Sequence, residues 1–280
     1  MTTLPTLYLS HGSPMTALEP GAAGAFLQRL GPAIDATFGR PKAVLAVSAH
    51  TLTRAPVLLA AARHEAVYDF HGFPDALYRL RYDAPGAPAL AERVQGLLAA
   101  AGIASHRIDE GGLDHGIWTP LRYAWPAADV PVLPLGFVPS WTPAQLLAFG
   151  QALAPLADEG VLVVGTGSLT HNLRLLSGPA GRPPPDTPEI AESAAFRAWV
   201  ADRAAAADWP ALLDYRRQAP HAALMHPTDE HWLPWYPAAG AAGPGAAGVR
   251  LHGSVTYGCL AMDAYGFGES ALALAEALAA

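Results

Sequence analysis

Residues 7–14, LYLSHGSP, set a pattern that organises the whole chain. A short apolar run ends there at a histidine, and a Gly-Ser-Pro turn follows. The pattern recurs at residues 43–50 (AVLAVSAH) and 161–171 (VLVVGTGSLTH). Each run has the length of a strand and lacks polar alternation, which is typical of strands buried on both faces of a parallel sheet. Because ligands of open α/β sheets bind beyond the carboxyl ends of the strands, we expect the three terminal histidines to share a site. These histidines are His11, His50 and His171.

The remaining segments alternate between extended and helical patterns. Strands are predicted at residues 7–10, 43–50, 56–62, 104–108, 130–138, 161–165 and 249–262. Helices are predicted at residues 21–30, 87–101, 142–157, 189–207, 210–217 and 269–279. The expected loops are residues 64–81 with a short helix, 110–120 entering a helix, the mobile low-complexity stretch 177–188, and 238–248. No linker separates two halves. We therefore predict a single α/β domain over residues 1–280, with a mostly parallel central sheet flanked by helices and a metal site at the carboxyl ends of the strands.

Composition narrows the class of protein. The net charge of −7 and the absence of a basic cluster argue against nucleic acid or an anionic membrane as a partner. The single cysteine, Cys259, cannot form an internal disulfide, and residues 1–10 lack the basic region of a signal peptide. No apolar run reaches membrane-spanning length. A cytoplasmic location is therefore expected, and the oligomeric state is left open.

Two further histidines stand in polar motifs. His231 lies in HPTDEH, beside Glu230 and five residues after His226, and His115 lies in LDHGIW. Neither motif is the H-E-x-x-H of zincin proteases. With one cysteine, any metal site must use nitrogen and oxygen ligands, which suit Fe(II) or Zn(II). The stretch GTGSLTHN lacks the lysine of a phosphate-binding P-loop, so its glycines, Gly165 and Gly167, are interpreted as allowing a tight turn at a strand end.

Six segments in order resemble the 4,5-DOPA dioxygenase (extradiol) family, a branch of the LigB-like class III extradiol ring-cleaving dioxygenases. They are LYLSHGSPM, PKAVLAVSAH, YDFHGFPDALYRLRYDAPG, GLDHGIWTPL, VGTGSLTHNLR and HPTDEHWLP, which span residue 7 to about residue 235. The resemblance implies a single α/β domain, in agreement with the strand pattern. It also implies a dioxygenase that opens a catecholic ring with O₂ and gives a muconic semialdehyde.

The resemblance also assigns roles to residues. It implies three metal ligands, which are His11, His50 and His231. His171 is implied to ligate the metal or to act as the acid–base residue, and His115 to line the substrate pocket and act in catalysis. Glu230 is an alternative third ligand, because better-known class III enzymes use two histidines and a carboxylate. The cofactor expected is one mononuclear divalent metal, Fe(II) for oxygenase activity, with Zn(II) as the other possibility.

Aromatic residues of the matching segments are candidates for the wall of a catechol pocket. They are Tyr68, Phe70, Phe73, Trp118 and Trp232. Two other functions are compatible with the same histidines. One is a zinc-dependent hydrolase on the same scaffold, with Glu230 as general base. The other is a non-catalytic metal-binding protein that serves in an interaction; the presence of both His115 and His171 favours the enzyme.

Overall fold

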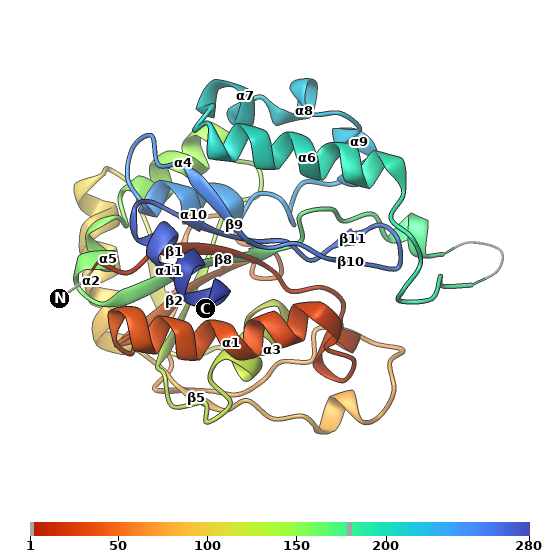
Figure 1. The fold of residues 1–280 in the computed structure, drawn as a ribbon. Coiled ribbons are helices and arrows are strands. Elements are labelled where there is room, and N and C mark those ends of the chain that lie inside the picture. Colours follow the sequence, from red (N-terminus) through yellow and green to blue (C-terminus); the bar gives the residue numbers. More distant parts are fainter. Residues whose placement is uncertain (1–2, 178–180) are drawn as a thin grey trace.

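The carboxyl ends of four parallel strands meet at one edge of the central sheet. The computed structural model describes residues 3–177 and 181–280. Its eight-stranded sheet has the order β6-β3-β7-β2-β8-β1-β12-β9 (Figure 1). These strands are β1 (Thr6–Ser10), β2 (Ala43–Ser48), β3 (Val57–Leu59), β6 (His106–Ile108), β7 (Val132–Gly136), β8 (Val161–Gly167), β9 (Gly248–His252) and β12 (Ala264–Phe267). The neighbours β7, β2, β8 and β1 are all parallel. At one side β12 pairs antiparallel with β1 and β9 antiparallel with β12, and at the other side β3 pairs antiparallel with β7. The predicted α/β fold with a mostly parallel sheet is confirmed.

Helices cover both faces of this sheet. They are α1 (Gly21–Phe38), α2 (Pro88–Ala100), α3 (His115–Ala124), α4 (Pro143–Gln151), α5 (Pro155–Asp158), α6 (Ala191–Ala205), α7 (Trp209–Leu213), α8 (Tyr215–Gln218), α9 (Ala222–Met225), α10 (Trp235–Ala241) and α11 (Ser270–Ala279). Short 3₁₀ turns are η1 (Pro14–Ala17), η2 (Leu77–Arg79) and η3 (Leu173–Leu176), and two small ribbons pair β4 (Arg63–His64) with β5 (Ala84–Pro85) and β10 (Val255–Thr256) with β11 (Leu260–Ala261). Figure 1 shows α1 and α3 on one face and α4, α6 and α10 on the other.

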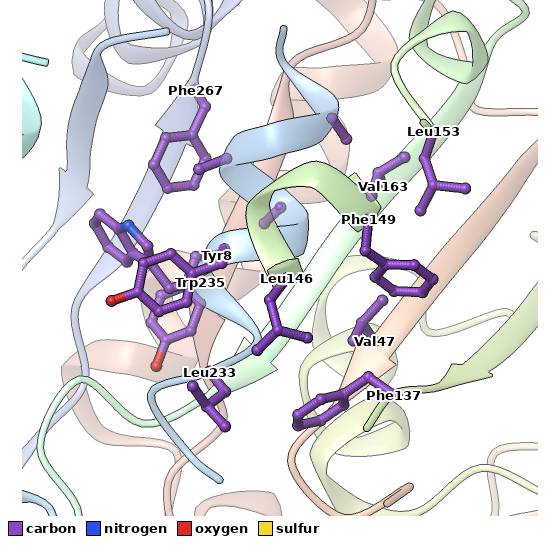
Figure 2. Packing of buried hydrophobic residues seen from close by; sticks show 14 of the residues in the cluster. Tyr8, Val47, Phe137, Leu146, Phe149, Leu153, Val163, Leu233, Trp235 and Phe267 are labelled. Atoms are coloured by element: carbon purple, nitrogen blue, oxygen red, sulfur yellow. The ribbon is translucent and has the colours of Figure 1, made fainter. Parts of the chain in front are cut away.

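The apolar strand runs are explained by burial on both faces. In β2, Val44 and Ala46 pack into the core beneath α1 and α3, whereas Leu45 and Val47 pack into the core beneath α4 and α10. Successive side chains of a strand point to opposite faces, so a strand covered twice needs no polar position. Figure 2 shows the second core, where the ring of Tyr8 lies 5.3 Å from that of Trp235.

Helix α10 corrects one prediction. Residues 238–248 were predicted to form a loop, but residues up to Ala241 are helical and buried. The segment has no polar face because it is enclosed between the sheet and α4. Glycines allow the close crossing, since a Cβ on Gly240 would lie 2.2 Å from the carbonyl oxygen of Leu147. The helix could not be recognised from amphipathic spacing, which an enclosed helix lacks.

Two other predicted elements differ in their boundaries. The helix predicted at 142–157 is divided, because Pro155 has no N–H to continue it; its start is fixed by a capping box between Thr142 and Gln145. The strand predicted at 249–262 ends at His252, and the left-handed residues Tyr257 and Gly258 turn the chain before β12. Residues 178–180 of the predicted loop 177–188 lie outside the described residues. In the part of the chain described, no helix is long and apolar enough to cross a membrane.

Candidate metal centre

Three imidazoles converge where the central strands end. His11 directly follows β1, His50 stands two residues after β2, and His231 lies four residues before α10. One ring nitrogen of each lies within 4.8 Å of the corresponding nitrogen of the other two. The sheet order brings β1 and β2 to either side of β8, so residues 39 positions apart in the chain meet.

The tautomer of His11 is set by a proline on a neighbouring helix. Pro120 in α3 has no N–H to donate to the carbonyl of Gly116 four residues earlier, and the Thr166 hydroxyl donates to that carbonyl instead, at 2.6 Å. With its own proton used, the Thr166 oxygen accepts from Nδ1 of His11 at 2.9 Å. Nδ1 of His11 therefore carries the ring proton, and Nε2 is left with a lone pair.

His50 and His115 share one carboxylate. Nδ1 of His50 lies 3.3 Å from Oδ2 of Asp69, and Nδ1 of His115 lies 3.0 Å from both Asp69 oxygens. Burial acts to raise the pKa of Asp69, but its hydrogen bonds and charge interactions with His115 outweigh burial and lower that pKa. An ionised carboxylate only accepts, so His115 donates from Nδ1 to Asp69 and keeps a lone pair on Nε2. The negative charge of the same carboxylate, 3.3 Å from Nδ1 of His50, favours the ring proton of His50 on Nδ1 as well.

His231 is oriented by its neighbour in the chain. Its Nδ1 lies 3.2 Å from Oε1 of Glu230, and the same oxygen accepts from the Thr228 hydroxyl at 3.0 Å. The hydrogen bond from His231 is the main cause that lowers the pKa of Glu230 to about 2. Glu230 is thus an ionised acceptor that holds the proton of His231 on Nδ1, which is the common outer partner of a metal-ligating histidine.

The distance between two of these nitrogens suits a metal ion. Nε2 of His11 and Nε2 of His50 are 3.1 Å apart, and both carry lone pairs in the tautomers derived above. Two lone pairs facing each other repel, and a cation between them removes the repulsion. Metal–nitrogen bonds of about 2.1 Å place two ligands roughly 3.0–3.4 Å apart at angles of about 90–109°. The donor set therefore fits one mononuclear divalent metal.

The charge state of the imidazoles agrees with this fit. Burial, followed by the neighbouring histidines, holds the pKa of His11 well below 6.5. Burial is also the main cause that lowers the pKa of His50 to about 4 and that of His231 to about 3. All three are neutral at pH 7, which is the form that binds metals.

His171 stands beside this group and outside it. Its ring stacks on that of His231 with centroids 3.4 Å apart and planes 9° apart. Together with Glu230 these two form a second cluster of potential ligands, which contains neither His11 nor His50. Burial is the main cause that lowers the pKa of His171 to about 4. The position is built by backbone pairing, because the amide of His171 donates to the carbonyl of Met225.

The five aromatic candidates for the pocket wall differ in exposure and in location. Tyr68, Phe70 and Phe73 are partly exposed, and the Phe70 ring meets that of His115 edge-on at 5.6 Å. Trp118 is fully buried behind them, with its indole N–H donating to the carbonyl of Val67. Trp232 is likewise fully buried, in the core beneath α10. The first three therefore form a wall beside His115, and Trp118 packs against Tyr68 and Phe70 from within the core. Trp232 lies in the core on the other face of the sheet and is not part of this wall.

The chain is similar to a known protein family, to several named proteins and to a solved structure. Residues 5–268 match the family described as the catalytic LigB subunit of aromatic ring-opening dioxygenase. The chain belongs to the LigB family. A relative from Beta vulgaris named 4,5-DOPA dioxygenase extradiol is 38% identical over 94% of this chain and 96% of its own. A protein of the same name from Portulaca grandiflora is 36% identical over 94% and 95% of the two chains. The crystal structure of an uncharacterized Escherichia coli K12 protein superposes with a TM-score of 0.75, at 30% identity, over 95% of this chain and 100% of that one.

Membership of the LigB family confirms the predicted family and enzyme class, an extradiol aromatic ring-opening dioxygenase acting on a small molecule with O₂. It also implies a mononuclear metal, for which the histidine cluster supplies the donors. A cavity of about 1330 Å³ lies away from these histidines, near Leu4 and Phe267 at the opposite end of the sheet.

Two glycines of the GTGSLTHN motif do not act as predicted. Gly165 and Gly167 lie within β8 rather than in a turn after it. A Cβ on Gly167 would lie 2.0 Å from the carbonyl oxygen of His231, and one on Gly165 would lie 2.1 Å from that of Pro234. The glycines allow the segment that carries His231 to lie directly against the strand, where Ser168 donates to the His231 carbonyl.

Several residues of the site were not singled out from the sequence. Asp69 and Thr166 orient histidines, and Asp114 accepts from Ser48 at 2.7 Å and Thr51 at 2.6 Å on either side of His50. Burial is the main cause that raises the pKa of Asp114. All lie inside the quoted motifs, so their position within a motif was the only signal. Their partners are 19 to 155 residues away in the chain.

Proposed function

We propose that this LigB protein holds one divalent metal between His11, His50 and His231 and cleaves a catechol beside one of its hydroxyls to give a muconic semialdehyde. The observation that carries the proposal is the common tautomer of the three imidazoles. Nδ1 of each lies 2.9–3.3 Å from a protein oxygen, which supports a ring proton on Nδ1 and a lone pair on Nε2. Glu230 is proposed as the outer partner of His231 and not as a ligand.

Fe(II) is the proposed metal. When bound it supplies adjacent positions for the catechol oxygens and O₂, and so the proximity and charge neutralisation that the reaction needs. Three neutral nitrogen ligands are compatible with Fe(II) and with Zn(II), so the assignment rests on the family's oxygenase chemistry.

Two histidines outside this triad are proposed to handle the substrate protons. His171, stacked on His231, is proposed as the general base for a catechol hydroxyl, because it lies beside the triad and no Nδ1 or Nε2 hydrogen bond ties it to the described residues. His115, fixed through Nδ1 by Asp69, is proposed to present Nε2 to the substrate as hydrogen-bond partner and second acid–base residue. Tyr68, Phe70 and Phe73 are proposed to pack against the ring and to exclude water.

A catechol of the DOPA type is proposed as substrate, since several relatives bear the name 4,5-DOPA dioxygenase extradiol. Residues 1–280 are proposed to form one catalytic domain, because the family match extends from residue 5 to 268. The buried, unpaired Cys259 supports the proposed cytoplasmic location. No observation favours the zinc hydrolase or the silent binding protein, and Glu230 is already engaged by His231.

The test is oxygen uptake after anaerobic reconstitution with Fe(II), with a panel of catechols that includes DOPA and protocatechuate. Uptake with formation of a yellow semialdehyde is expected. Uptake that fails with every catechol, from protein shown to hold stoichiometric iron, would refute the proposed reaction. Reconstitution with Zn(II) in parallel is expected to give a filled but inactive site.

Two variants separate the proposed roles. His50→Ala is expected to lose bound metal, and full occupancy in that variant would remove His50 from the ligand set. His171→Phe preserves the stacked ring against His231 and is expected to hold metal while losing at least 100-fold in kcat, within the usual contribution of a general base. Loss of metal from His171→Phe would make His171 a ligand instead.

A further inference from the structure

The carboxylate of Asp69 accepts hydrogen bonds from His115 and lies close to His50. Its Oδ1 accepts from the backbone N–H of His115 at 2.9 Å, at the start of α3. Both oxygens accept from Nδ1 of His115 at 3.0 Å, and Oδ2 also lies 3.3 Å from Nδ1 of His50. The Asp69 side chain is about one-fifth exposed and lies against both imidazoles.

Neither imidazole has another partner for Nδ1 within residues 3–177 and 181–280. Beyond the contact with Asp69, the backbone N–H of His50 donates to the Ser48 hydroxyl, and Nε2 of His50 faces Nε2 of His11 at 3.1 Å. The rings of His50 and His115 lie 4.2 Å apart, so a change in orientation of either one disturbs the other. One carboxylate thus controls a proposed metal ligand and a proposed substrate contact at once.

We propose that Asp69 is a positioning residue that locks His50 and His115 in the Nδ1–H tautomer, so that the Nε2 atoms of both face the reaction site. The inference rests on the proposed function, in which His50 binds the metal and His115 meets the substrate. Neither the strand pattern nor the recurrence of histidines in the sequence indicates this role for the aspartate of the YDFHG motif.

The position of Asp69 in the chain extends this role to the substrate wall. Tyr68 and Phe70 flank it directly, and their rings lie 6.1 Å apart. Phe70 contacts the His115 ring, and the Tyr68 hydroxyl donates to the carbonyl of Leu80 at 2.6 Å. The contacts of Asp69 with His50 and His115 therefore hold the aromatic segment 68–70 in a fixed position beside the proposed metal centre.

Asp69→Asn is the sharpest perturbation, because it preserves size and removes one acceptor. If the amide oxygen takes the place of Oδ1, it still satisfies the N–H and Nδ1 of His115. The amide NH₂ then faces Nδ1 of His50, and two donors oppose each other. His50 relieves the conflict by moving its proton to Nε2, where it blocks metal binding.

Two measurements on the full chain test this. Nitrogen-15 NMR of the metal-free protein reports which ring nitrogen of each histidine carries the proton, and competition with a chelator measures the Kd for Zn(II). Wild type is expected to show protonated Nδ1 at both His50 and His115. In Asp69→Asn we expect His50 to change tautomer and the Kd for Zn(II) to rise 10–100-fold, the usual cost of removing an outer partner of a metal ligand.

Asp75→Asn is the matched control, since it makes the same chemical change at an exposed position of the same loop. It is expected to leave the tautomers and the Kd unchanged. A wild-type His50 protonated on Nε2, or an Asp69→Asn Kd within twofold of wild type, would overturn the inference. If Asp69→Asn does not fold, the wild-type spectrum alone tests the inference, and a proton on Nε2 of His50 overturns it. Wild type that binds no Zn(II) would refute the proposed metal site itself, which is a different outcome.

Discussion

Replacement of Thr166 by valine tests how strongly the fold orients the metal centre. Valine has nearly the same shape as threonine, so the change removes only the hydroxyl. That hydroxyl is buried, accepts from Nδ1 of His11 at 2.9 Å and donates to the carbonyl of Gly116 at 2.6 Å. Pro120 offers that carbonyl no substitute donor. Two buried groups lose their partners, at a cost of about 1–3 kcal/mol each, so we expect the free energy of unfolding to fall by about 2–6 kcal/mol.

Metal affinity is expected to fall as well. Without Thr166, nothing holds the proton of His11 on Nδ1, and the Nε2–H tautomer cannot bind a metal. The loss of an outer partner costs roughly 10–100-fold in affinity. Urea denaturation of the metal-free protein measures the first effect, and chelator competition with Zn(II) measures the second.

Thr170→Val is the matched control. The Thr170 hydroxyl is also buried, donates to the carbonyl of Cys259 at 2.7 Å and accepts from the amide of Ala261 at 2.8 Å, with no imidazole among its partners. Both variants are expected to lose similar stability, and only Thr166→Val to lose metal affinity. Equal Kd values for Zn(II) in Thr166→Val and wild type would refute the derived tautomer of His11.

Three other predictions follow from buried contacts. Gly167→Ala places a methyl group 2.0 Å from the His231 carbonyl, so it is expected to displace His231 and to abolish stoichiometric metal binding, measured by elemental analysis; an occupied variant would contradict the close approach. Burial lowers the pKa of His226 from 6.5 to about 4, so between these values the unfolded chain binds a proton that the folded chain does not. The free energy of unfolding is therefore expected to fall by about 2–3 kcal/mol from pH 7 to pH 4.5 through this residue alone, and urea titrations of His226→Asn should show a correspondingly weaker pH dependence. The Thr119 hydroxyl is buried without a partner among the described residues, so Thr119→Val is expected to raise stability by about 1 kcal/mol in the same assay, and a loss of stability would reveal a missed partner.

Much of the architecture could be predicted from local pattern. The apolar runs before His11, His50 and His171 indicated doubly covered strands, because burial on both faces leaves a continuous apolar run in the local sequence. The same reasoning failed for α10, which is enclosed on all sides and so shows no amphipathic period. It also failed at Gly165 and Gly167, where the need for glycine comes from a segment some 65 residues further along the chain.

The sequence by itself determined the family, the strand-end position of the histidines and the nitrogen-rich character of the donor set. Only the tertiary structure decided which nitrogen of each imidazole is free, through Thr166 for His11, Asp69 for His50 and Glu230 for His231. It also separated His171, stacked on His231, from the group formed with His11. The physical reason is that a strand's burial is encoded within a few residues, whereas a proton's position depends on the acceptor that faces it. Here the sheet order brings Thr166 to His11 from 155 positions away, and a loop brings Asp69 to His50, whereas Glu230 is the chain neighbour of His231.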